Sequence, residues 1–302
     1  MSNREPDLIS IVIPTHNRSG RLLRAIESVQ GQSWPCLEII VVDDASSDDT
    51  PVRLRQLAVA DARVRWVRNL TPQGGGGSRN IGLAQAQGTY VAFLDDDDVW
   101  HPDKLALQHA LLDAHPEASA TSCSFTIANE AGTRVKREVT LLSLQDDQQL
   151  LRANCLGGAS MCLARRAVLE RIGGFDPRLP SGQDWDLWLR LSQEGPILVH
   201  ERALVYYIPH AGSRITGNLR AEYLGRRMIY IRYRRVMNSA TRAYVLRELC
   251  FYRRVLLRRH WPGRLSGLCW LWRIAPGLIA RLRYAYRLAK AVWQGRLRQV
   301  AR

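Results

Sequence analysis

The sequence predicts an α/β protein with a mainly parallel, wound central sheet, followed by a basic helical region. Short apolar runs rich in β-branched residues alternate with helical segments over residues 8–94, the order typical of a parallel sheet covered by helices. Aspartates follow two of these runs directly. Residues 220–302 contain 21 basic and two acidic residues, a net charge of +19, whereas the preceding part carries −4 of the total of +15.

The first part of the chain alternates strands and helices. Residues 8–13 form a buried strand ended by Pro14, and residues 20–30 place apolar side chains at helical spacing. The following elements are a strand at 38–42, a helix around 51–59, a strand at 63–67, a flexible loop at 71–78, a helix at 79–87 and a strand at 90–94. In such sheets the ligand lies beyond the carboxyl ends of the strands. We therefore expect the polar residues after these strands to meet.

Beyond residue 100 the alternation weakens. We expect a helix at 102–114, strands at 119–127 and 160–163, a helix at 167–172, a tight turn at 173–177, a helix at 184–191 and a strand at 198–208. From residue 220 the pattern is helical and basic. Hydrophobic residues make up 46% of the chain and charged ones 24%, as in an ordinary folded protein.

Four consecutive aspartates, Asp95 to Asp98, follow the strand at 90–94. Two unit charges about 4 Å apart repel by about 1 kcal/mol in water and about 4 kcal/mol at the dielectric of a protein surface. A divalent cation with oxygen ligands removes this repulsion and also holds a diphosphate. The alternative is a solvated acidic turn. The preceding strand and the flanking sequence favour the cation site.

Six segments in a fixed order carry a family resemblance: residues 10–18, 38–47, 77–82, 88–98, 172–176 and 183–190. Together they resemble the family 2 glycosyltransferases, inverting enzymes with the GT-A nucleotide-sugar fold. The resemblance implies an EC 2.4 enzyme of hexosyltransferase type that uses a nucleotide-diphosphate sugar. The acceptor would be a hydroxyl of a glycan or of a polyprenyl- or lipid-linked molecule in cell-surface polysaccharide synthesis. UDP-sugars are favoured, while guanosine and thymidine nucleotides stay open.

The resemblance also implies a donor site at the ends of the strands. It assigns the nucleotide sugar to Pro14, Thr15, Asn17, Arg18, Asp44, Arg79, Asp95, Asp96 and Asp176. Asp97 and His210 would bind Mn²⁺ or Mg²⁺, with Asp98 behind them or capping the next helix. Asp44 would accept a hydrogen bond from the base. Its alternative role is a helix N-cap, which suits Ser46 or Ser47 better.

An inverting transfer needs a carboxylate that takes the proton of the acceptor hydroxyl. The resemblance implies Asp184 for this role, because it matches the aspartate of the family's Glu-Asp motif. Gln183 stands where the family has an acidic neighbour. Asp186, two residues further and on a different helix face, is the competing candidate.

The resemblance and the charge distribution divide the chain. We expect a catalytic domain over residues 1–219, its nucleotide-binding half about 1–100 and its acceptor-binding half about 101–219, and a basic helical region over 220–302. That region mixes tryptophans with arginines but lacks the ~20 apolar residues of a membrane span. This composition suits helices lying on an anionic membrane surface. Packing on the catalytic domain is the alternative.

Other classes of function fit less well. No nucleic-acid-binding module is recognisable, so nucleic acid is not an expected partner. No GxGxxG follows the first strand, which argues against a dinucleotide-dependent dehydrogenase. The six cysteines form no CxxC pair, and charged residues precede the first apolar run, so we expect a cytoplasmic protein at the inner face of the membrane. A non-catalytic nucleotide-binding scaffold with a degraded site is the second hypothesis, suggested by Gln183.

Overall fold

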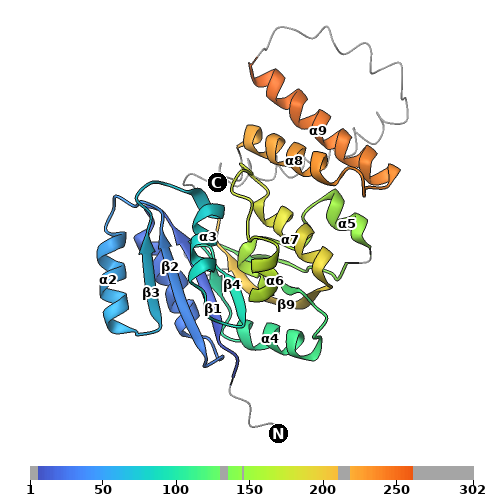
Figure 1. The fold of residues 1–302 in the computed structure, drawn as a ribbon. Coiled ribbons are helices and arrows are strands. Elements are labelled where there is room, and N and C mark those ends of the chain that lie inside the picture. The colour runs from blue at the N-terminus through green and yellow to red at the C-terminus, as the bar shows by residue number, and fades with distance from the viewer. Residues whose placement is uncertain (1–5, 130–134, 145, 210–217, 261–302) are drawn as a thin grey trace, which may run out of the picture. The chain divides into compact units, whose positions relative to one another are not determined.

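A single mixed sheet forms the centre of the protein. The computed structural model describes residues 6–129, 135–144, 146–209 and 218–260 (Figure 1). The strands in these ranges are β1 (Ile9–Thr15), β2 (Leu37–Asp43), β3 (Val64–Arg68), β4 (Tyr90–Phe93), β5 (Val99–Trp100), β6 (Ala120–Ala128), β7 (Val135–Val139), β8 (Leu163–Arg165) and β9 (Ile197–Tyr207). Their order is β3-β2-β1-β4-β8-β6-β9-β5, with β7 paired to β6. The predicted α/β class is confirmed.

The two halves of the sheet differ in strand direction. β1 pairs in parallel with β2 and β4, and β2 pairs in parallel with β3. β8 is antiparallel to both of its neighbours, β4 and β6, whereas β6 and β9 run parallel. Thr15 stands opposite Asp43 at the end of the β1–β2 pair. The parallel half therefore brings the carboxyl ends of its strands to one edge, as the sequence predicts.

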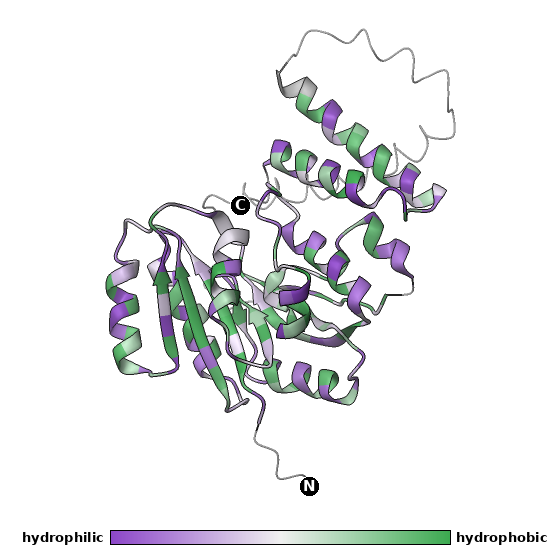
Figure 2. Ribbon diagram, viewed as in Figure 1, coloured by the Kyte–Doolittle hydropathy of each residue, from purple (hydrophilic) through white to green (hydrophobic). Residues whose placement is uncertain are grey.

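Helices cover the sheet. They are α1 (Ser19–Gln30), α2 (Thr50–Ala60), α3 (Gly74–Gln85), α4 (Lys104–Ala114), α5 (Asp147–Arg152), α6 (Arg166–Arg171), α7 (Gln183–Glu194), α8 (Leu219–Tyr233) and α9 (Ser239–His260). Alternate residues of β1 enter different cores: Ile11 packs with Ile26 of α1, and Val12 belongs to the cluster that contains Trp188 of α7. Because both faces are buried, the strands read as continuous apolar runs. Figure 2 shows hydrophobic and hydrophilic residues alternating along the helices.

Several predicted boundaries are wrong. The glycine run expected as a loop begins α3, because the Asp44 carboxylate accepts hydrogen bonds from the backbone N–H groups of Gln73 and Gly74. The strand expected at 160–163 is a 3₁₀ turn, Ala159–Met161, followed by β8. The short elements β5, β7 and α5 were not predicted, since two to six residues give little periodicity.

The chain divides into two compact units, residues 1–252 and 253–302. In the first unit, α8 and the beginning of α9 contribute buried side chains to the core, among them Ile229, Tyr233 and Leu249. No helix in the described ranges is both long enough and apolar enough to cross a membrane. The five cysteines in those ranges are free. The predicted interfacial helices over residues 261–302 lie outside the described residues.

Candidate active site

The ends of β1 and β4 meet through Asp96. Its Oδ2 accepts a hydrogen bond from Thr15 Oγ1 at 2.7 Å, and its Oδ1 accepts one from Arg18 Nη1 at 2.9 Å. Arg18 also pairs with Asp97 at 3.4 Å. Burial, with a smaller effect of Asp97, raises the pKa of Asp96 to about 6, although Arg18 and Thr15 oppose the shift. Asp96 therefore ties the two strand ends together from the inside.

Arg79, from α3, supplies a second cation to the aspartate run. Its guanidinium pairs with Asp95 and lies over the ring of Phe175, 5.2 Å from the centroid. The side chain is buried, and its Nε has no hydrogen-bond partner among the described residues. Two arginines thus offset part of the repulsion expected among the four carboxylates. Arg18 pairs with Asp96 and Asp97, and Arg79 pairs with Asp95.

Among the described residues, no arginine or lysine pairs with Asp98. The residue is 3% exposed, and its Oδ1 has no hydrogen-bond partner in the described part of the chain. Burial raises the pKa of Asp98 well above its ordinary value, and the charges of Asp95 and Asp97 add to this effect. One oxygen each from Asp95, Asp97 and Asp98 lies within 4.8 Å of the others. Hard oxygen donors clustered in this way fit Mg²⁺ or Mn²⁺.

This cluster refines the expected metal site. It groups Asp97, the predicted ligand, with Asp95, and the metal-binding role of Asp97 stays a prediction. Asp98, expected behind the ligands or as a helix cap, contributes an oxygen to the cluster and does not cap α4, which begins at Lys104. The other predicted ligand, His210, lies outside the described residues.

Asp184 stands in the first turn of α7 and faces the same region. Its Oδ2 approaches Gly158, 3.7 Å from the position that a Cβ would take there. Burial raises the pKa of Asp184 to about 6; Arg79 opposes the shift and Asp95 adds to it. Within the described residues its carboxylate accepts no hydrogen bond, so it is available to a proton donor. Gln183 packs against Gly76 of α3 and donates to Leu179 O at 2.9 Å.

The competing carboxylate, Asp186, is fully buried, and both of its oxygens accept hydrogen bonds from arginines. Its Oδ2 accepts from Arg190 Nε at 2.8 Å, and its Oδ1 accepts from Arg232 of α8. Asp176, predicted to touch the donor, is held in the same way by Arg178 and Arg232. These arginines hold the pKa of Asp176 well below its usual range, Arg178 having the largest effect.

Asp44 and Asn17 organise loops beside the strand ends. Besides receiving the two N–H groups that begin α3, Asp44 accepts from Asn69 Nδ2 at 2.8 Å. Asn17 has a φ of 53° and its Oδ1 accepts from Ser47 N at 2.7 Å. Ser46 Oγ accepts from Asn17 N at 2.9 Å. Neither serine caps α2, whose N-cap residue is Asp49; the cap-like role belongs to Asp44, at α3.

The predicted residues thus fall into groups. Direct contacts join Thr15 and Arg18 to Asp96, and Arg18 to Asp97. Arg79 pairs with Asp95 and interacts electrostatically with Asp184. Pro14 is partly exposed at the end of β1. Asp176 is joined to Asp186 through Arg232. Sequence reasoning missed Ser160, whose Oγ accepts from Asp95 N at 3.0 Å, and Arg232. An arginine in a segment rich in arginines gives no individual signal.

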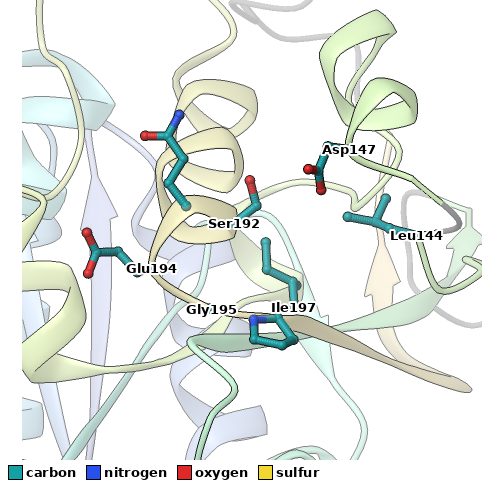
Figure 3. Close-up of a pocket in the computed structure, with 8 residues that line it drawn as sticks. Leu144, Asp147, Ser192, Glu194, Gly195 and Ile197 are labelled. Carbon is teal, nitrogen blue, oxygen red and sulfur yellow. The ribbon is translucent and has the colours of Figure 1, made fainter. Parts of the chain in front are cut away.

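A pocket of about 500 Å³ lies elsewhere, at the far end of α7. Ser192 and Glu194 line it together with Leu144 and Asp147 (Figure 3). Asp147 and Glu194 lie on opposite sides of the pocket in this view. Glu194 is paired with Arg171 at 2.7 Å. None of the predicted site residues that the structure describes lines this pocket, so it is separate from the aspartate cluster.

Comparisons with known proteins agree with one another. The family model described as "Glycosyl transferase family 2" matches residues 10–173. A GalNAc(5)-diNAcBac-PP-undecaprenol beta-1,3-glucosyltransferase of Campylobacter jejuni is 31% identical over 225 residues, which cover 72% of this chain and 71% of that protein. An uncharacterised glycosyltransferase of Haemophilus influenzae is 30% identical over 191 residues, which cover 62% of this chain and 63% of its own length.

Solved structures show the same fold. TarS of S. aureus, in complex with UDP-GlcNAc, matches with a TM-score of 0.63 at 22% identity, over 83% of this chain and 74% of that one. The mannosyltransferase PcManGT of Pyrobaculum calidifontis, in complex with GDP-Man and Mn²⁺, matches with a TM-score of 0.59 at 19% identity. That match covers 94% of this chain and 83% of the other.

Proposed function

Because the chain belongs to glycosyl transferase family 2 and is therefore a glycosyltransferase, EC 2.4, we propose the following reaction. The enzyme transfers a sugar, with inversion, from a nucleotide-diphosphate sugar to a hydroxyl of a glycan or a polyprenyl- or lipid-linked acceptor in cell-surface polysaccharide synthesis. The favoured donor is a UDP-sugar. The proposal rests on one observation: Arg79 pairs with Asp95 of the Asp95–Asp97–Asp98 cluster and also interacts electrostatically with the Asp184 carboxylate.

Asp184 is the proposed general base. Its carboxylate takes the proton of the acceptor hydroxyl as that oxygen bonds to the anomeric carbon, and the bond from this carbon to the diphosphate breaks. Burial holds the pKa of Asp184 at about 6. A base with this pKa is ionised at neutral pH and still accepts a proton readily. The absence of a hydrogen-bond partner on Asp184 within the described residues supports this choice over Asp186.

Asp95, Asp97 and Asp98 are the proposed ligands of Mn²⁺ or Mg²⁺, with His210 as a further predicted ligand. When bound, the cation neutralises charge on the departing diphosphate. Arg18 and Arg79 lie beside the carboxylates and offer additional cations to the phosphate groups. Thr15 and Asn17 form the adjoining wall of the proposed nucleotide site, with Pro14, Asp44 and Asp96 supporting it.

The names of relatives support the donor and acceptor classes. The C. jejuni relative is named for an undecaprenol-linked acceptor, and the TarS structure contains UDP-GlcNAc. PcManGT contains GDP-Man with Mn²⁺, so a guanosine donor is the alternative. We further propose that residues 1–100 bind the nucleotide and residues 101–219 bind the acceptor. Asp95 and Asp184 lie on opposite sides of that division.

Residues 220–302 are proposed to contact an anionic membrane surface. Exposed apolar side chains occur on and between α8 and α9: Ile231 is 44% exposed, Val236 61% and Phe251 53%. They stand among exposed arginines in a segment with a net charge of +19. An apolar and basic surface of this kind suits a peripheral position on the cytoplasmic leaflet, where lipid-linked acceptors are reached.

A panel of UDP-, GDP- and dTDP-sugars tests the proposal. We expect one donor class to raise the unfolding temperature of the purified full-length protein and to release nucleoside diphosphate with Mn²⁺. A chelator and the variant Asp97→Ala should both abolish turnover, whereas Asp113→Ala, which removes an exposed carboxylate on α4, should not. Donor binding without any turnover, with all lipid-linked acceptors offered, would favour the scaffold hypothesis suggested by Gln183.

A further inference from the structure

Helix α8 packs closely against the segment that precedes α7, within the compact unit of residues 1–252. A Cβ at Gly225 would lie 2.1 Å from the carbonyl oxygen of Ser181, so the two backbones are in direct contact. One turn later, Ile229 is 1% exposed and packs beside Gly182. Gly182 is the N-cap residue of α7. α8 therefore contacts the loop that leads into α7, the helix that carries Asp184.

Arg232 lies one further turn along the same face of α8. Its Nη2 donates to Asp176 Oδ2 at 2.5 Å, and its Nη1 donates to Asp186 Oδ1. Asp186 belongs to the first turns of α7, two residues after Asp184, and Asp176 follows the turn at Gly173 and Gly174. One guanidinium thus joins two segments that approach the site from different parts of the chain.

The Asp176 side of this bridge continues to the aspartate cluster. Asn80 of α3 accepts from Phe175 N at 2.7 Å and donates to Phe175 O at 2.8 Å. The Phe175 ring contacts the guanidinium of Arg79, which pairs with Asp95. A continuous set of contacts therefore runs from Arg232 through residues 175 and 176 to Arg79, and a second branch runs through Asp186 to the helix of Asp184.

We propose that Arg232 is a positioning residue for transfer: its bridge between Asp176 and Asp186 fixes the first turn of α7, and with it the Asp184 carboxylate, relative to Arg79 and Asp95. The inference rests on the proposed function, in which Asp184 is the base. A planar fork with two N–H directions is needed to hold both carboxylates at once. Here each carboxylate accepts from a different nitrogen of the guanidinium. Lysine keeps the charge but carries all three N–H donors on one nitrogen, so it reproduces the bridge less well.

An ordinary stabilising ion pair is the competing explanation. The Arg232 side chain is 33% exposed, whereas those of Asp176 and Asp186 are 7% and 0% exposed. Water therefore screens the pair only in part, and it is expected to contribute to stability. The explanations differ in what a substitution changes. A merely stabilising pair alters the unfolding temperature, whereas a positioning residue alters the chemical step while donor binding is kept.

The test compares Arg232→Gln, Arg232→Lys and the matched control Arg227→Gln in the full-length protein. Arg227 is exposed on the same helix, so its loss removes the same charge. Displacing a catalytic group by about 1 Å costs up to about 100-fold in rate. We expect kcat to fall by about that factor in Arg232→Gln and about tenfold in Arg232→Lys, with the KM for the donor nearly unchanged. Assayed in solution without vesicles, where the proposed membrane contact plays no part, Arg227→Gln should match the wild type.

Hydrogen exchange of residues 173–190 gives a readout that does not need turnover. We expect faster exchange there in Arg232→Gln than in the wild type or Arg227→Gln, including under conditions where no donor is turned over. A wild type without transferase activity would overturn the proposed function and leave this readout intact. Unchanged kcat and exchange in Arg232→Gln, full activity in the folded Arg232→Lys protein, or an equal loss in Arg227→Gln would overturn the positioning role.

Discussion

Asp184 and Asp186 are two residues apart, yet their surroundings are opposite. Asp186 is fully buried and bonded to two arginines, whereas Asp184 accepts no hydrogen bond within the described residues. A carboxylate whose oxygens are taken by arginines is a poor base, because a proton must displace an ion pair. The contrast separates a chemical role from a structural one within a single turn of α7.

Two isosteric variants should divide these roles. Asp184→Asn should lower kcat by about 10²–10⁴-fold, the usual contribution of general base catalysis, and leave the unfolding temperature nearly unchanged. Asp186→Asn should instead destabilise the protein by about 1–3 kcal/mol, since it removes the buried carboxylate that Arg190 and Arg232 both contact. Thermal unfolding and kcat measured on both proteins check this. An active Asp184→Asn enzyme would contradict the assignment.

The raised pKa of Asp184 predicts a pH dependence. Burial places this pKa at about 6, and only the ionised form accepts a proton. We therefore expect kcat to fall about tenfold for each pH unit below about 6 and to level off above it. Because burial also raises the pKa of Asp96 to about 6, donor affinity must be followed over the same range. A loss of kcat at constant affinity assigns the titration to Asp184; a flat profile would contradict it.

At the scale of elements, α3 depends on glycines for its packing. A Cβ at Gly82 would lie 2.3 Å from Val12 Cγ1 of β1, so the helix sits against the sheet with no room for a methyl group. Gly76 similarly faces the side chain of Gln183. This close packing carries Arg79 and Asn80 to the site, at the cost of low helix propensity.

Two glycine-to-alanine variants test this packing. Gly82→Ala should destabilise the protein by about 1–3 kcal/mol, the usual cost of an overpacked core. Gly20→Ala, in α1, meets nothing within 4 Å and should stabilise it by up to about 1 kcal/mol through helix propensity. Denaturant unfolding of both variants gives the comparison. Equal effects of the two substitutions would show that α3 does not need the close approach.

The elements also show what sequence reasoning could predict. The strands of the parallel half and most helices were found because apolar periodicity reports burial directly. The start of α3 was missed because its first N–H groups bond to Asp44, about thirty residues earlier in the chain, and local patterns do not contain such contacts. The motifs led us to expect Asp95, Asp97 and Asp184 near one another. The oxygen that Asp98 contributes to the cluster and the contacts of Arg232 could be seen only in the folded structure.

At the scale of the whole molecule, charge is separated along the sequence. Residues 1–219 carry a net charge of −4 and precede residues 220–302, which carry +19. Each basic residue near an anionic leaflet contributes about 1 kcal/mol, and salt screens this attraction. An enzyme with a lipid-linked acceptor gains from such a contact because it brings the site near the membrane surface.

This separation predicts binding to anionic vesicles. The full-length protein should sediment with phosphatidylglycerol vesicles at low salt and be released at about 0.5 M salt, where screening is strong. Arg235→Gln should weaken binding by up to about fivefold, given about 1 kcal/mol for each charge near the surface. Arg55→Gln, which removes an exposed arginine from α2, should have no effect. A protein that stays in solution with these vesicles at low salt would contradict the membrane contact.

The proposed mechanism depends above all on metal binding by the clustered carboxylates after β4. A crystal of the full-length protein with Mn²⁺ and UDP, measured at the manganese absorption edge, tests them most directly. We expect one anomalous peak bound by oxygens of Asp95, Asp97 and Asp98 and by the diphosphate, with the Asp184 carboxylate facing the sugar position. UDP bound without manganese at these aspartates, or manganese bound elsewhere, would contradict it.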